Sequence, residues 1–137
     1  MKKKLIDVKN HSFIIKADYD DVLLLAKLIQ AEGEGEPMIG KVAIGAIVVN
    51  RVQNPNFPNS VSEVIFEPGQ FESVTNNRIF NIENIDEESI ISALKALEGE
   101  DPTDGSLYFY NRYTATSDWI KSKKVSVAIG KHNFIAE

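Results

Sequence analysis

The sequence contains no cysteine and only two histidines, His11 and His132. Without thiols, the chain can form neither a disulfide nor a zinc site built on cysteine. Neither histidine belongs to a His-x-x-x-His or His-Glu pair, and the motifs Gly-x-Ser-x-Gly and Gly-Lys-Ser/Thr are absent. Zinc hydrolases, serine-nucleophile hydrolases and phosphate-loop proteins are therefore disfavoured, and we expect neither a cofactor nor a metal centre.

Strong positive charge and long apolar runs are missing as well. The net charge is −5, and basic residues cluster only at 2–4 and 121–124, so we expect no nucleic-acid partner. No run approaches the roughly 20 apolar residues of a membrane span. The opening Met1–Lys4 resembles the start of a signal peptide, but Asp7 and Lys9 interrupt the roughly 7–15 apolar residues that must follow. The sequence therefore predicts no signal peptide and synthesis in the cytoplasm.

Apolar residues recur at helical spacing through much of the first hundred residues, and capping residues mark where the helices begin. The predicted helices cover residues 20–32, 37–52 and 86–98, with a shorter one after a Ser60–Glu63 capping box. Gly33 and Gly35 end the first helix. The second is apolar nearly all round, which is typical of a central buried helix.

The last third of the chain changes to strand patterns. Residues 107–110 form one predicted strand, and 125–129 and 132–136 form a hairpin around a Gly130-Lys131 turn. The fold class is therefore α+β, with helices followed by a small C-terminal antiparallel sheet. Residues 1–17 are expected to be an N-terminal arm or hairpin, and 18–137 a single domain.

Three acidic residues, Glu32, Glu34 and Glu36, lie at the junction of the first two predicted helices. A carboxyl group in a cleft between helices can stay protonated against apolar walls and donate a proton in catalysis. An exposed acidic turn fits the same spacing, and three carboxylates could also hold Ca²⁺. The pattern alone leaves these alternatives open.

Aromatic and amide side chains gather in the second half: Phe71, Tyr108, Tyr110, Asn111, Tyr113 and Trp119. Sugar rings stack on aromatic faces, and their hydroxyls pair with amide and phenol groups. A glycan-binding surface is one interpretation, and ordinary core and strand packing is the other. His132 lies on a predicted strand, where a structural histidine is the simpler interpretation.

A series of motifs extends over about residues 20–135: Ala26–Pro37, Gly40–Val52, Phe57-Pro58, Val64–Pro68, Gln70-Phe71, Leu107–Asn111, Thr116, Trp119 and Ile129–His132. In these segments the chain resembles the spore cortex-lytic cell wall hydrolases, the SleB/CwlJ family. The resemblance implies a lysozyme-like helical domain that cleaves the glycan strands of peptidoglycan. The SleB branch implies a lytic transglycosylase acting on cortex that contains muramic-δ-lactam.

The resemblance also assigns roles. The catalytic glutamate is the first of the Ala-Glu-x-x-Gly-Glu motif, here Glu32, and the second is Glu36, expected to support the site or begin the next helix. The residues expected to bind substrate are Glu36, Gln70, Phe71, Tyr110, Asn111, Thr116, Trp119 and His132. A location in the spore, in the coat or the cortex, is implied as well.

Other functions remain compatible with the sequence. An N-acetylmuramidase-type hydrolase would use water and commonly a second carboxylate. A non-catalytic peptidoglycan-binding protein of the spore coat would keep the fold alone. An intracellular phage lysin and a calcium-dependent enzyme are further alternatives.

Overall fold

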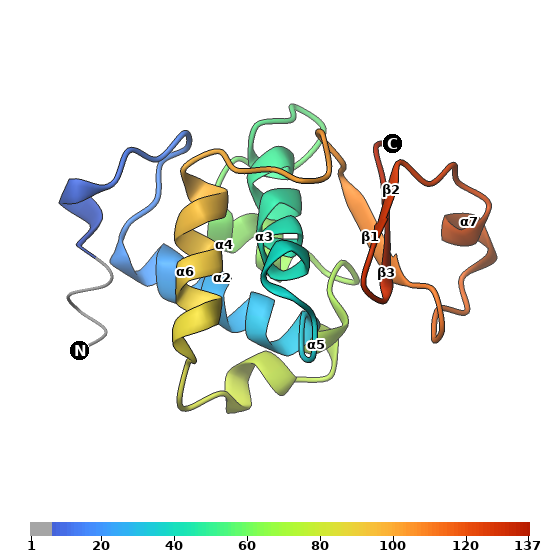
Figure 1. Cartoon of the computed structure of the whole chain (residues 1–137), viewed down its shortest axis with the longest axis horizontal. Helices are drawn as coiled ribbons and strands as arrows, with labels where there is room; N and C mark the ends of the chain where they lie inside the picture. Colours follow the sequence, from blue (N-terminus) through green and yellow to red (C-terminus); the bar gives the residue numbers. More distant parts are fainter. Residues whose placement is uncertain (1–6) are drawn as a thin grey trace.

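The computed structural model describes residues 7–137, and its elements follow the predicted α+β order. The helices and turns are η1 (Val8–Asn10), α2 (Tyr19–Glu32), α3 (Met38–Val52), α4 (Val61–Phe66), α5 (Glu72–Thr75), η2 (Arg78–Asn81), α6 (Glu87–Leu97) and α7 (Asp118–Lys121). The strands are β1 (Tyr108–Asn111), β2 (Val127–Ile129) and β3 (His132–Ile135). The sheet lies at one side of the helical body, away from the N-terminal segment (Figure 1). The predicted helices and strands are confirmed, whereas α5, η2 and α7 were not predicted.

The predicted caps start the main helices. The carboxylate of Asp18 accepts the N–H of Asp21, and the carboxylate of Asp21 accepts the N–H of Asp18, each at 2.9 Å. Ser60 and Asp86 accept the N–H three residues later in the same way. These local bonds satisfy donors that a helix otherwise leaves unpaired, which is why the sequence places these starts well.

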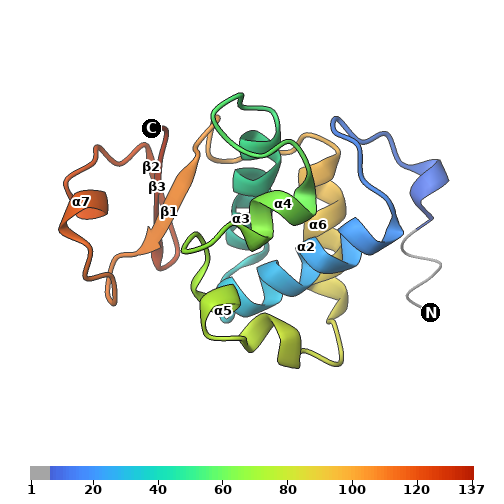
Figure 2. The same ribbon diagram turned by 180° about the vertical axis from the view of Figure 1, so that it is seen from behind.

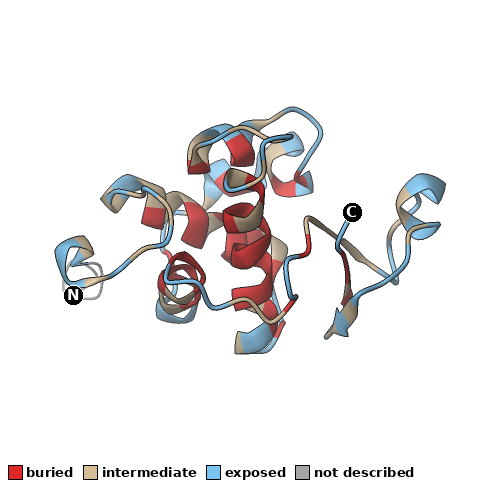
Figure 3. Ribbon diagram, turned by 90° about the horizontal axis from the view of Figure 1, so that it is seen from above, coloured by how far each residue is buried: buried red, intermediate tan, exposed pale blue. Residues whose placement is uncertain are grey.

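Helix α3 is the centre of the molecule, and most of its length is buried when seen from above (Figure 3). It lies between α6 on one side and the sheet on the other. Gly45 allows α6 to pack closely, because a Cβ at this position would lie 2.8 Å from the Cβ of Ala96. Among the described residues, no helix has the length and apolar character that a membrane span requires.

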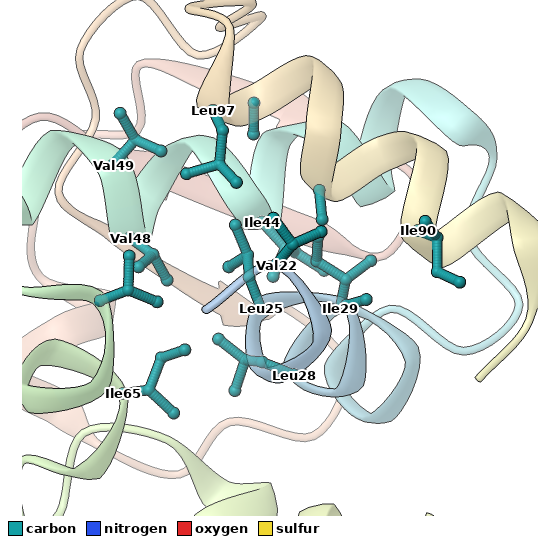
Figure 4. Close-up of a cluster of buried hydrophobic side chains, with 14 of the residues drawn as sticks. Val22, Leu25, Leu28, Ile29, Ile44, Val48, Val49, Ile65, Ile90 and Leu97 are labelled. Atoms are coloured by element: carbon teal, nitrogen blue, oxygen red, sulfur yellow. The ribbon is translucent and has the colours of Figure 1, made fainter. Parts of the chain in front are cut away.

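The main core is formed by the helices. Figure 4 shows its labelled side chains: Val22, Leu25, Leu28 and Ile29 of α2, Ile44, Val48 and Val49 of α3, Ile65 of α4, and Ile90 and Leu97 of α6. From behind, α4 crosses α2 and α3, and the chain then descends to α5 beside the end of α2 (Figure 2). This arrangement brings the C-terminal end of α2 next to a segment 40 residues later in the chain.

The sheet has the order β1-β3-β2 and is antiparallel throughout. The β2–β3 turn is the predicted Gly130-Lys131 pair, and Gly130 has a φ of +57°. A second, smaller core cluster joins the sheet to α3 through Ala43, Ile47 and Phe134. The sheet is therefore fixed to the face of α3 opposite α6.

The N-terminal segment differs from one of its two predicted forms. Residues 7–17 contain the short turn η1 and no strand, so the predicted hairpin is wrong for this part, while Leu5 and Ile6 lie outside the described residues. The segment packs against the helical core instead. The N–H of Ile14 donates to the carbonyl of Leu97 at 2.8 Å, and Phe13 and Ile15 contact the core cluster. A boundary after residue 17 stays a prediction.

The loop between α6 and β1 is organised by Asp101. Its carboxylate accepts hydrogen bonds from the side-chain amide of Asn50 at 3.0 Å and from the backbone of Thr103 and Gly105, each at 2.8 Å. Asn50 also donates to the carbonyl of Ser106 at 2.9 Å. The loop is thereby tied to the C-terminal end of α3, where it sets the start of β1.

This loop gives a pH-dependent prediction. Burial acts to raise the pKa of Asp101, but hydrogen bonds from Thr103, Asn50 and Gly105 outweigh it and hold that pKa below its ordinary value. The carboxylate therefore stabilises the fold above the unfolded-state pKa, and this contribution is lost as the pH falls through the folded-state pKa. We expect Asp101→Asn to lower the free energy of unfolding by about 1–2 kcal/mol near neutral pH.

Urea unfolding at neutral and strongly acidic pH measures this effect. The difference between wild type and Asp101→Asn should shrink in acid, where both side chains are neutral. A difference that is equally large at both pH values would contradict the role assigned to the carboxylate.

Candidate active site

Glu32 is the last residue of α2 and is half-buried. Its Oε2 accepts the backbone N–H of Ser73, in the first turn of α5, at 2.8 Å. Within residues 7–137, its Oε1 accepts no hydrogen bond. One oxygen is thus held in a fixed direction and the other is available to a ligand, as a general acid requires.

The three glutamates of the acidic cluster lie in different environments. Glu34 is exposed, whereas Glu36 is 6% exposed and is bound to the β2–β3 turn. Across the part of the chain that the structure describes, no three carboxylate or imidazole side chains gather in a way that could hold a metal ion. The turn between α2 and α3, which contains Gly33 and Gly35, therefore directs Glu32 to different surroundings from Glu34 and Glu36.

Glu36 joins the helices to the sheet. Its Oε1 accepts the N–H of Lys131 at 3.0 Å and lies 2.9 Å from Nδ1 of His132. The side chains of His132 and Glu36 are only 8% and 3% exposed. A Cβ at Gly130 would lie 2.7 Å from Oε2 of Glu36, so the turn needs glycine for space as well as for its positive φ. The pair fixes the hairpin to the start of α3.

A cavity of about 630 Å³ opens between the C-terminal end of α3 and the sheet. Its lining includes Arg51, Phe57, Glu67, Gln70, Tyr108 and Trp119. Arg51 is 3% exposed, and its guanidinium carbon lies 5.0–5.2 Å from the ring centres of Phe57, Phe71 and Tyr108. Burial lowers the pKa of Arg51. An arginine of this kind stays charged because the aromatic faces and polar partners compensate for lost water.

Arg51 also connects the walls of the cavity. Its Nε donates to the carbonyl of Leu107 at 2.8 Å, and its Nη1 donates to the side-chain oxygen of Gln70 at 3.2 Å. Arg51, Glu67 and Ser73 were not predicted as site residues from the sequence. The one available signal was a charged residue within a helix that is otherwise apolar nearly all round, since such a residue needs buried partners.

The residues predicted to bind substrate are placed in three ways. Gln70 and Trp119 line the cavity, with Trp119 57% exposed. Phe71, Glu36 and His132 are buried, so they support the walls. On the sheet and the segment that follows β1, Tyr110 and Asn111 are half-buried and Thr116 is exposed.

Two of these side chains have partners within the sheet region. The hydroxyl of Tyr110 accepts a hydrogen bond from the amide of Asn133 at 3.0 Å. The side-chain oxygen of Asn111 accepts the N–H of Tyr113 at 2.9 Å. Neither residue lines the cavity beside Arg51. A role for them in substrate binding stays a prediction.

The family described as Cell Wall Hydrolase matches residues 35–135 of this chain. The chain belongs to this cell wall hydrolase family. A relative within it, the spore cortex-lytic enzyme of Halalkalibacterium halodurans, is 43% identical over 115 residues, which make up 84% of this chain and 34% of that protein. The chain spans between a third and a half of the length of the spore cortex-lytic enzymes to which it is similar.

Two solved structures of cell wall hydrolases share the fold. One is the catalytic domain of the germination-specific lytic transglycosylase SleB from Bacillus anthracis, with a TM-score of 0.80 and 39% identity, covering 87% of this chain and 96% of that one. The other is the catalytic domain of Bacillus cereus SleB, with a TM-score of 0.79 and 40% identity, covering 88% and 94%. The predicted lysozyme-like fold is confirmed.

The bond between Ser73 and Glu32 gives a prediction about positioning. Proline at residue 73 removes the N–H that holds the Glu32 carboxylate, at a place near the start of α5 where proline is tolerated. We expect Ser73→Pro to reduce kcat roughly 10–100-fold, because the general acid predicted at Glu32 would lose its alignment. Cleavage kinetics on purified peptidoglycan measure the change.

Ser73→Ala is the matched control. It keeps the N–H and removes only a buried hydroxyl that has no partner among the described residues. We expect it to retain activity within about threefold. Equal losses in the two variants, with unchanged melting temperatures, would show that the N–H does not position Glu32.

Proposed function

We propose that this chain cleaves the glycan strands of peptidoglycan as a lytic transglycosylase of spore cortex, with Glu32 as its catalytic acid and then its base. The observation that supports the proposal is the difference in hydrogen bonding between the carboxylates of Glu32 and Glu36. Glu32 has one anchored and one free carboxylate oxygen, whereas Glu36 is bound to the hairpin. A mechanism that needs a single carboxylate fits this arrangement better than one that uses both.

The proposed reaction has two proton transfers. Glu32 donates its proton to the glycosidic oxygen as the bond from that oxygen to C1 of the muramic acid breaks, and positive charge develops at C1. The 6-hydroxyl of the same muramic acid then attacks C1 and gives its proton to the Glu32 carboxylate. The products are a 1,6-anhydromuramic end and a new non-reducing end. No water is consumed, and Glu32 is protonated again.

The relatives support this chemistry. Proteins that share this domain are named spore cortex-lytic enzymes, and one solved relative is described as a germination-specific lytic transglycosylase. The presence of Glu32 at the end of α2 in the same fold makes a purely structural peptidoglycan-binding role the weaker alternative. We further propose that the substrate includes the muramic-δ-lactam form found in cortex, and that the chain acts in the spore, at the cortex or coat.

Product analysis tests the proposal. Purified cortex is digested in water enriched in ¹⁸O, and the muropeptides are analysed by mass spectrometry. We expect anhydro ends that carry no ¹⁸O. Reducing ends labelled with ¹⁸O would instead show an N-acetylmuramidase-type hydrolase, and binding without product would show a non-catalytic protein. Cortex and vegetative wall, compared side by side, test the preference for muramic-δ-lactam.

A further inference from the structure

We propose that the cavity beside Arg51 is a subsite for an N-acetylated sugar residue of the glycan strand, and that the Glu67 carboxylate recognises this sugar by accepting a hydrogen bond from it. This inference rests on the proposed function, because it assigns a second position along the same glycan substrate. It adds a specificity-determining residue that lies outside the acidic cluster at the end of α2.

One carboxylate oxygen of Glu67 lacks a hydrogen-bond donor among the described residues. This oxygen, Oε1, is buried, although the side chain lines the cavity. A buried carboxylate oxygen without a donor costs free energy, which a ligand hydroxyl or amide N–H would recover. The unpaired acceptor therefore favours a ligand that brings a donor into the cavity.

Arg51 does not fill this need. Arg51 and Glu67 interact electrostatically, but no hydrogen bond joins them among the described residues. The Nε and Nη1 atoms of Arg51 donate to the carbonyl of Leu107 and the side chain of Gln70. Its guanidinium is also fixed between three aromatic rings. The positive charge of Arg51 offsets the negative charge of Glu67, and the exposed Glu137 also lines the cavity, so the cavity disfavours an anion and suits an uncharged polar ligand.

The walls of the cavity suit a sugar. Trp119 is more than half exposed and packs against Tyr108 in a T-shaped arrangement, with ring centres 5.8 Å apart and planes at 83°. Lys123 lies over the Trp119 ring at 4.9 Å and leaves part of the indole open. Exposed aromatic surface beside fixed polar groups is the usual composition of small-ligand sites, and about 630 Å³ is enough for a sugar residue.

The cavity is adjacent to the catalytic glutamate. Gln70 lines it, and three residues later Ser73 donates to Glu32. Three residues of chain span at most about 11 Å, so one glycan strand can reach both places. The sugar in the cavity is therefore a neighbour of the sugars at the cleavage point, and it is bound without taking part in the reaction.

Binding measurements test the subsite without cleavage. The parent is Glu32→Gln, and the probe is a soluble tetramer of N-acetylglucosamine, titrated by calorimetry. We expect Glu67→Ala in this parent to weaken binding about tenfold, and Glu67→Gln, which keeps an acceptor oxygen, to stay within about threefold. Glu83→Ala is the control, because Glu83 is an exposed acidic residue that does not line the cavity. Binding by Glu67→Ala equal to the parent, or no binding by the parent, would overturn the inference.

A peptide-bearing glycan fragment separates sugar from stem peptide. If Glu67→Ala weakens only the peptide-bearing fragment, the cavity holds the peptide and the inference is wrong. With Glu32 intact, Glu67→Ala should raise KM on cortex fragments about tenfold and change kcat less than about twofold. Wild-type cleavage with no effect of Glu67→Ala would overturn the subsite alone. Weaker sugar binding in a protein that forms no anhydro product would overturn the proposed function alone.

Discussion

Glu32→Gln is expected to reduce cleavage of cortex peptidoglycan roughly 10²–10⁴-fold while leaving the fold intact. Glutamine has the shape of glutamate and keeps an oxygen that can accept the N–H of Ser73, which now lies 2.8 Å from Oε2. It cannot give a proton to the leaving oxygen or take one from the attacking hydroxyl. The loss should therefore appear in kcat, with binding of the glycan nearly unchanged.

The matched control is Glu34→Gln, two residues along the chain. Glu34 is exposed, so its replacement should change activity less than about twofold. Initial rates of anhydro-muropeptide formation, with melting temperatures for each variant, measure both effects. Full activity in a folded Glu32→Gln protein would refute the assignment of the catalytic acid.

Glu36→Ala is expected to lower the free energy of unfolding by about 3 kcal/mol. The alanine leaves the N–H of Lys131 and the ring of His132 without their partner in a region where both side chains of the pair are almost fully buried. It also creates a space beneath Gly130, which contacts the carboxylate directly. Both effects destabilise the attachment of the hairpin to α3.

Chemical unfolding gives the change in free energy, and hydrogen exchange on β2 and β3 shows where it acts. Glu36→Gln keeps an acceptor of the same size and should lose less than half as much stability. Glu34→Ala, at an exposed position in the same turn, should lose little. A stable Glu36→Ala protein with a protected hairpin would show that the pair does not fix the sheet.

Local signals account for most of what could be predicted from the sequence. Asp18, Ser60 and Asp86 cap helices through bonds only three residues long, so their effect is visible in a short stretch of sequence. The Gly130 turn is equally local. The helices α5 and α7 have four residues each and show no apolar periodicity, which is why they were not predicted.

The site was predicted only in part, because its contacts join distant segments. The family motif singles out Glu32 from the acidic cluster, but the bond that orients it comes from Ser73, 41 residues later. The resemblance predicts that Phe71 and His132 bind substrate, whereas the structure buries both side chains. Arg51 and Glu67 lie in segments that carry the family resemblance, but the sequence assigned them no role, because their roles arise when α3, the α4–α5 segment and β1 meet around the cavity.

The contact between Glu36 and the hairpin also determines when the sheet can be attached to the helices. Its partners Lys131 and His132 follow Glu36 in the sequence by 95 and 96 residues, so the hairpin is fixed to the start of α3 only after residue 132 has been synthesised and has left the ribosome. Long-range contacts of this kind form late in folding because a large loop must close first. A nascent chain that ends before the hairpin already contains Glu32 and the helical core, yet lacks the strand that pairs with β1. The attachment of the sheet to α3 is therefore completed after the helices that carry Glu32 have been synthesised.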